Sequence, residues 1–267
     1  MRSNLSTFGK LFFVFMTLFL FSISPAFSQG TIVVPHPYTR ADGDTNNLLP
    51  FNCGFFPQFA SFRYQQIYAG SQIGKSTIDG VSFRLGRTLV VNPGFPPTTL
   101  PGVQINMSTT EAIPGELSDT YADNIGPDDT VVFSGDLTIS APDCASHPCP
   151  FVVDVPLQQS FEFDPANGNL LVDFRIPDCV NLGNSVNFDA TNLFPDITSR
   201  ASGQDVNNPT GDADDLGLVT QFRGTGFISG TTQPIPTLSE WGMIAAAGGL
   251  GLIGVFFAIK RKRARVV

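Results

Sequence analysis

The sequence predicts an all-β protein: an antiparallel two-sheet sandwich of jelly-roll type, between an N-terminal signal peptide and one C-terminal transmembrane helix. Three observations lead to this prediction. Apolar and polar residues alternate in short runs through the middle of the chain, Gly, Pro, Asn and Asp separate those runs, and each end carries an apolar segment. Alternation with a period of two places every second side chain on one face, as in a half-buried strand.

Residues 1–28 are predicted to form a secretory signal peptide. Arg2 and Lys10 give this segment a positive start, and residues 11–21 are almost wholly apolar. Small residues follow at Ala26 and Ser28, three positions and one position before Gln29. These are the three parts of a cleavable signal, so we expect cleavage after Ser28 and an exported chain.

Residues 29–224 are predicted to form the exported β-sandwich. The runs with the clearest alternation are 81–86, 103–107, 170–176 and 218–223, and further runs lie at 62–69, 130–134, 151–156 and 186–190. Eight strands without intervening helices favour two sheets packed face to face. The chain has 25 Phe and its single Trp is Trp241, so we expect Phe to fill the space between the sheets.

Four cysteines, Cys53, Cys144, Cys149 and Cys179, lie in the exported part. An even number in an oxidising compartment predicts two disulfides, for which three pairings exist. A bridge between Cys144 and Cys149 is geometrically easy because their loop is short, and it leaves Cys53 to pair with Cys179. The alternative is a zinc site with His147 between the two cysteines, but that site would need a fourth well-placed ligand, and exported thiols rarely stay reduced.

The exported part is strongly acidic. Eight of the 15 basic residues and all 23 acidic residues lie between residues 29 and 240, which gives a net charge of −15. Lys75 is the one lysine among those eight. This charge disfavours binding to nucleic acid or anionic lipid. It is compatible with divalent cations, with basic partners, or simply with solubility outside the cell.

Calcium is the one cofactor that the sequence suggests, and only weakly. Asp42 and Asp44 offer oxygen ligands at alternate positions, but Asn47 and Cys53 stand where an EF-hand loop needs Gly and Glu. Asp212 and Asp214 belong to a second acidic loop, with Asp205, Asn207 and Asp215. The interpretation of both segments as flexible polar loops without a metal is the favoured one.

No catalytic residue is predicted. Glu162, Asp164 and Asp173 are expected near one another across a hairpin, and paired carboxylates are what glycoside hydrolases use, although solvated surface acids are the simpler interpretation. The chain has no G-x-S-x-G elbow and no phosphate-binding glycine loop. Tyr64 and Tyr68 share one face of a predicted strand. They either stack on sugar rings or lie at the edge of the core, and we favour the core.

The C-terminal segment has three parts in a fixed order. A short polar motif at 235–242 precedes 19 uncharged residues at 241–259, and a basic tail follows at 260–265. A helix of that length covers about 28 Å, close to the hydrocarbon thickness of a bilayer. The basic tail orients this end toward the cytoplasm, and Trp241 is placed as an interfacial anchor. Residues 225–234 are predicted to be a linker.

This arrangement resembles the IPTL-CTERM protein-sorting signal, which is related to the PEP-CTERM signals of Gram-negative bacteria. The residues that carry the resemblance are Ile235, Pro236, Thr237, Leu238, Trp241 and Gly242. The resemblance implies recognition by an exosortase, a membrane-embedded cysteine transpeptidase-like enzyme, after passage through the export machinery. It further implies a single-pass intermediate in the inner membrane with a cytoplasmic C-terminus, and a final location at the cell surface or outside the cell.

Two segments of the exported part, 63–84 and 161–173, resemble the β-sandwich passenger domains of PEP-CTERM-type proteins, which supports the predicted fold. We therefore expect a non-enzymatic surface or extracellular-matrix protein that an exosortase processes at its C-terminal signal. The alternative is a calcium- or carbohydrate-binding module with extracellular polysaccharide as a partner. A secreted glycan hydrolase is the less favoured third hypothesis.

Overall fold

A computed structural model describes residues 29–87, 93–183 and 186–227 of the chain. The chain divides into two units, Met1–Ile228 and Ser229–Val267, and the description below concerns the first. The predicted signal peptide and the predicted transmembrane helix both lie outside the described residues. Within those residues, no helix combines the length and the apolar character needed to cross a bilayer.

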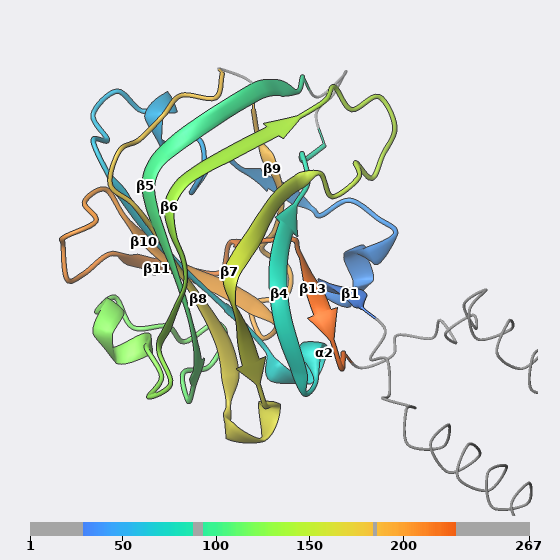
Figure 1. Cartoon of the computed structure of the whole chain (residues 1–267), viewed down its shortest axis with the longest axis vertical. Coiled ribbons are helices and arrows are strands. Elements are labelled where there is room, and N and C mark those ends of the chain that lie inside the picture. The colour runs from blue at the N-terminus through green and yellow to red at the C-terminus, as the bar shows by residue number, and fades with distance from the viewer. Residues whose placement is uncertain (1–28, 88–92, 184–185, 228–267) are drawn as a thin grey trace, which may run out of the picture. The chain divides into compact units, whose positions relative to one another are not determined.

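The described unit is built almost entirely from antiparallel strands, which confirms the all-β prediction (Figure 1). Its one α-helix in the described part is the single turn α2 (Gly70–Ile73). The strands are β1 (Gly30–Val34), β2 (Thr45–Asn47), β3 (Phe62–Tyr68), β4 (Ser76–Phe83), β5 (Phe95–Thr110), β6 (Thr130–Ala141), β7 (Val153–Phe163), β8 (Asn169–Ile176), β9 (Phe188–Thr191), β10 (Thr198–Gly203), β11 (Asp212–Asp214), β12 (Gly217–Leu218) and β13 (Thr220–Thr225).

The strands form three sheets where two were predicted. A four-stranded sheet has the order β1-β13-β4-β7, and a six-stranded sheet has the order β11-β10-β3-β8-β5-β6. A third sheet of three short strands, β12-β9-β2, was not expected. Its strands have two to four residues, so the run at 186–190 indicates β9 but segments this short do not reveal a separate sheet. Figure 1 shows β5 and β6 curving together over one end of the unit.

Phenylalanine fills the centre of the core, as the composition predicted. Phe51 is fully buried, and its ring lies 5.0 Å from Phe83 of β4, 5.6 Å from Phe174 of β8 and 5.3 Å from Phe188 of β9, measured between centroids. One aromatic residue from each sheet therefore contacts the same ring. Tilted and edge-on aromatic pairs of this kind contribute about 0.5–1.5 kcal/mol each beyond the burial of their area.

Two disulfides close the fold with the predicted pairing. Cys53, in the 3-10 turn η2 (Cys53–Phe55), is bonded to Cys179 just after β8, across a sequence separation of 126. Cys144 is bonded to Cys149 in the loop between β6 and β7, across a separation of 5. The first bridge ties two distant segments together, and the second staples one loop.

The predicted hairpin at residues 161–173 does not form. β7 pairs with β4 in the four-stranded sheet, whereas β8 pairs with β3 and β5 in the six-stranded sheet. The connecting turn η4 (Pro165–Asn167) thus crosses from one sheet to the other, and Asp164 caps it by accepting a bond of 3.0 Å from the backbone N–H of Ala166. Turn residues identify a reversal of the chain but not the sheet that the next strand joins.

The two ends of the unit lie side by side. β1 pairs with β13 along its whole length, with Gly30 opposite Gly224. The first strand of the unit therefore begins where its last strand ends.

Candidate functional site

The face of the six-stranded sheet that is turned away from the main core carries two rows of polar side chains. The sequence alternation creates this face, because Tyr64, Phe174 and Ile105 point into the core and their neighbours point the other way. The cross-strand register gives the first row as Arg63, Arg175 and Gln104, and the second row as Gln65, Asp173 and Asn106. Each row takes one residue from β3, β8 and β5.

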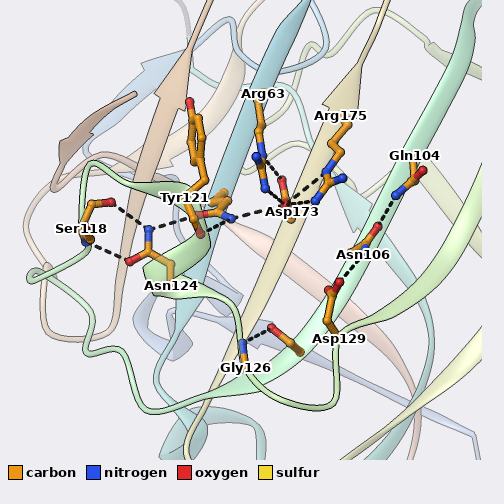
Figure 2. Close-up of polar contacts among 12 residues, drawn as sticks. Arg63, Gln104, Asn106, Ser118, Tyr121, Asn124, Gly126, Asp129, Asp173 and Arg175 are labelled. Carbon is orange, nitrogen blue, oxygen red and sulfur yellow. Dashed lines mark hydrogen bonds and ion pairs between the residues drawn. The ribbon is translucent and has the colours of Figure 1, made fainter. Parts of the chain in front are cut away.

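Asp173 is the centre of this arrangement (Figure 2). Arg63 donates to it through Nε at 3.1 Å and Nη2 at 2.6 Å, and Arg175 donates through Nη2 at 3.2 Å. Gln65 Nε2 adds a bond of 3.3 Å, and the Asp173 side chain is only 2 % exposed. Two guanidinium groups thus share one carboxylate, which leaves a local charge of +1 on a strongly acidic protein.

The segment between β5 and β6 covers one end of these rows. Its 3-10 turn η3 (Tyr121–Asn124) places the Tyr121 ring over the Arg63 guanidinium, 4.3 Å from Cζ to the ring centroid. Gln65 donates to the Tyr121 carbonyl at 3.2 Å, and Asn124 donates to Gln65 Oε1 at 3.0 Å. Asn124 also exchanges bonds of 2.8 and 2.9 Å with the backbone of Ser118, so the polar rows hold this segment in place (Figure 2).

Two further contacts fix the far end of the same segment. Asn106 donates to Asp129 Oδ2 at 2.9 Å, and the backbone N–H of Gly126 donates to Ser108 Oγ at 3.1 Å (Figure 2). A Cβ at Gly126 would lie 1.8 Å from the Thr109 carbonyl oxygen, so only glycine fits there. The segment is therefore attached to the sheet at both ends by buried polar groups.

Tyr121 is fully buried, and within the described residues its hydroxyl has no hydrogen-bond partner. Burial raises its pKa well above the ordinary value, although the nearby Arg63 charge opposes this effect. Donors occupy both carboxylate oxygens of Asp173. The arrangement can position a segment of chain and present the half-buried guanidinium of Arg175, which is paired with Asp173.

The three carboxylates proposed for glycan hydrolysis do not share a site. Glu162 lies on β7, where its Oε2 accepts a bond of 3.0 Å from Thr77, and Asp164 pairs with Lys75 at 2.7 Å. These residues line an open hollow of about 420 Å³, whereas Asp173 lies in the other sheet. The expectation that Glu162 and Asp173 meet across a hairpin is wrong, because the hairpin itself is absent.

Each histidine contacts a polar group from another segment of the chain. His36 Nε2 lies 2.7 Å from the Gln72 carbonyl, and His147 Nδ1 lies 3.2 Å from Asp42. The His147 Nδ1 atom also lies 3.8 Å from the Sγ atom of Cys149, which is held in the disulfide. Neither imidazole is bonded to a serine or threonine hydroxyl in the described part of the chain. The histidine–hydroxyl pair that covalent acyl transfer uses is therefore not formed among the described residues.

Tyr64 and Tyr68 are core residues. They are 0 % and 1 % exposed, and their hydroxyls bond to Gln66 and Thr220, both at 2.8 Å. The interpretation of these tyrosines as a sugar-stacking surface is therefore wrong, and the interpretation as core residues is confirmed.

Three of the four weak calcium candidates are already engaged by other side chains. Asp42 contacts His147, Asp44 accepts a bond of 2.8 Å from the Tyr38 hydroxyl, and Asp214 forms a fork-shaped pair with Arg200, with both bonds at 2.8 Å. Burial acts to raise the pKa of Asp44, but hydrogen bonds from Thr191 and Tyr38 outweigh it and lower the pKa. Asp212 lies in the short edge strand β11.

A second buried ion pair was not foreseen from the sequence. Arg84 is 1 % exposed and donates to Asp189 Oδ2 at 2.7 Å and to the Tyr38 carbonyl at 3.0 Å, while Gly43 N–H donates to Asp189 Oδ1 at 2.8 Å. Burial raises the pKa of Asp189 to about 6, which still leaves its carboxylate ionised opposite Arg84 at pH 7. The pair fixes the loop between β1 and β2.

The comparison with known protein families yields one match, and it lies at the C-terminus. The family described as IPTL-CTERM motif matches residues 233–263, which include all six predicted motif residues. The chain carries an IPTL-CTERM sorting motif. The resemblance inferred from residues 235–242 is thereby confirmed. The motif implies recognition by an exosortase-type enzyme, and it indicates export to the cell surface. No curated protein and no solved structure matches the chain.

Proposed function

We propose that the chain is a non-enzymatic surface or extracellular-matrix protein, exported as a single-pass intermediate and processed by an exosortase at its IPTL-CTERM signal. The match at residues 233–263 carries this proposal. The proposal includes removal of residues 1–28, a transmembrane helix at 241–259 with a cytoplasmic basic tail, and a jelly-roll-like arrangement of the exported domain. Export machinery and the exosortase are its processing partners.

The chemistry of the described unit supports the non-enzymatic part of the proposal. Asp173 and Asp189, its two best-buried carboxylates, are each neutralised by arginine, and neither histidine faces a hydroxyl. The pairing of β1 with β13 is compatible with this topology, because the first residue of β1 lies opposite the end of β13.

Expression of the full chain in two otherwise identical hosts, with and without an exosortase, tests the proposal. We expect the protein in the membrane fraction of the host that lacks the enzyme and in the released fraction of the host that has it. A variant with Pro236→Ala and Trp241→Ala is the control, and it should stay in the membrane fraction of both hosts. Release that is independent of the enzyme and of the motif would contradict the proposal.

A further inference from the structure

The loop between β6 and β7 gathers metal-binding atoms that the function proposed above does not use. The sulfur atoms of Cys144 and Cys149 and the His147 Nδ1 atom all lie within 4.8 Å of one another. Asp42 approaches from the loop between β1 and β2, with its Oδ1 atom 3.2 Å from His147 Nδ1. Asp42 contacts the histidine but does not lie within 4.8 Å of both sulfur atoms, so it becomes the fourth ligand only when its side chain turns toward them.

We propose that reduction of the Cys144–Cys149 disulfide turns this loop into a binding site for a thiophilic divalent ion, with Zn²⁺ as the type case. The four ligands are Cys144, Cys149, His147 and Asp42. The disulfide and the metal are mutually exclusive, so the loop exists in an oxidised, stapled form and in a reduced, metal-bound form.

The conversion requires two electrons, and a dithiol reductant is the class of partner that supplies them. A thiolate of the reductant attacks one sulfur of the bridge, the other cysteine leaves as a thiolate, and the second thiol of the reductant resolves the mixed disulfide. The reductant ends as a disulfide, and the protein holds two thiols. Zn²⁺ then displaces one proton from each thiol, since the thiolate is the ligand.

The geometry suits a tetrahedral ion without large movement of the backbone. The Cα atoms of Cys144 and Cys149 are 5.9 Å apart. Two thiolates on one tetrahedral zinc lie about 3.8 Å apart, since each Zn–S bond is about 2.3 Å. Rotation of the two side chains provides that separation. The two thiolates alone neutralise the ion and the carboxylate brings the site to a net charge of −1, while the side chains of Asp42 and His147 are only 12 % and 23 % exposed.

The other disulfide has no such alternative. Cys144, His147 and Cys149 form the one group of three candidate ligand residues in the part of the chain that the structure describes, and neither Cys53 nor Cys179 belongs to it. After reduction, the short loop still holds its two thiols within a separation of 5 residues, whereas Cys53 and Cys179 are 126 residues apart.

Metal titration of the full chain in mild detergent tests the proposal. A water-soluble phosphine reduces the protein, peptide mapping confirms which bridge has opened, and Co²⁺ is added as a spectroscopic substitute for Zn²⁺. We expect one Co²⁺ per chain, with sulfur-to-cobalt charge-transfer bands and the intense visible bands of a tetrahedral ion, and displacement by one equivalent of Zn²⁺. The oxidised protein should show none of these bands.

Single variants distinguish a metal site with four positioned ligands from nonspecific metal binding by the two thiols alone. His147→Gln and Asp42→Asn should each weaken Zn²⁺ binding by about tenfold or more, and Cys144→Ser with Cys149→Ser should abolish it. Asp143→Asn is the matched control, because it removes an equal charge beside Cys144 from a carboxylate that contacts Gly94 instead. Absence of the thiolate bands, unfolding on reduction alone, or equal affinities in Asp42→Asn and Asp143→Asn would each overturn the proposal.

Discussion

Removal of the two disulfides one at a time should affect stability very unequally. In the chain-entropy description, a bridge stabilises the fold by restricting the unfolded chain, and the effect grows with the logarithm of the loop length. For the separations of 126 and 5 residues, this gives about 5 kcal/mol for Cys53–Cys179 and about 2 kcal/mol for Cys144–Cys149. The expected difference in the free energy of unfolding is therefore about 3 kcal/mol.

The assay compares Cys53→Ala with Cys179→Ala against Cys144→Ala with Cys149→Ala, by urea unfolding without reductant. Cys53, Cys144 and Cys149 are all buried, so loss of packing adds to the cost in both double variants and the difference between them reflects mainly the loop lengths. The first double variant should also show a larger urea dependence, because its unfolded chain is less compact. Equal losses, or a larger loss from the short bridge, would refute the loop-entropy reasoning.

Three more predictions follow from the described contacts. Asp173→Asn should lower the free energy of unfolding by about 3–5 kcal/mol, because it leaves the buried Arg63 charge uncompensated. Replacement of the exposed Glu162 in Glu162→Gln should change it by no more than about 0.5 kcal/mol. Similar losses for the two variants in denaturant melts would contradict this prediction. Burial raises the pKa of all four tyrosines, that of Tyr64 to about 12, so the stability they contribute is complete below pH 10 and is lost as the pH rises through the folded pKa values. Tyrosinate absorbance should therefore appear only together with alkaline unfolding. Tyrosine ionisation near pH 10 in a protein that keeps its native circular dichroism would disprove this prediction. Calcium should leave the melting temperature unchanged, because three candidate carboxylates already have partners; a rise that Asp214→Asn abolishes would show a real site.

The strands that carry the candidate site were predictable because alternation is a local signal. Residues 170–176 and 62–69 alternate as expected, and they form β8 and β3 with Phe174 and Tyr64 on the core face. The disulfide pairing could also be predicted from the sequence, since the short six-residue loop from Cys144 to Cys149 favours one of the three possible pairings. In both cases, the decisive contacts lie within a few residues of each other or follow from a strict period.

The sheet assignment and the buried ion pairs were not accessible by the same reasoning. Residues 161–173 contain a good turn signal, but its strands belong to different sheets, and only tertiary pairing decides that. Arg84 follows a strand and has the appearance of an outward-facing charge, yet its partner Asp189 lies 105 residues away. Asp173 likewise receives Arg63 from 110 residues away. No periodicity or spacing in a single sequence encodes such partners.

The mass of the mature protein tests the central claim most directly. Intact-protein mass spectrometry, on material from cells that contain an exosortase, should give a chain that begins at Gln29 and lacks the apolar residues 241–259. The same chain from cells without the enzyme should retain those residues. If residues 241–259 are present in both samples, the protein is an ordinary single-span membrane protein and sorting by cleavage is excluded.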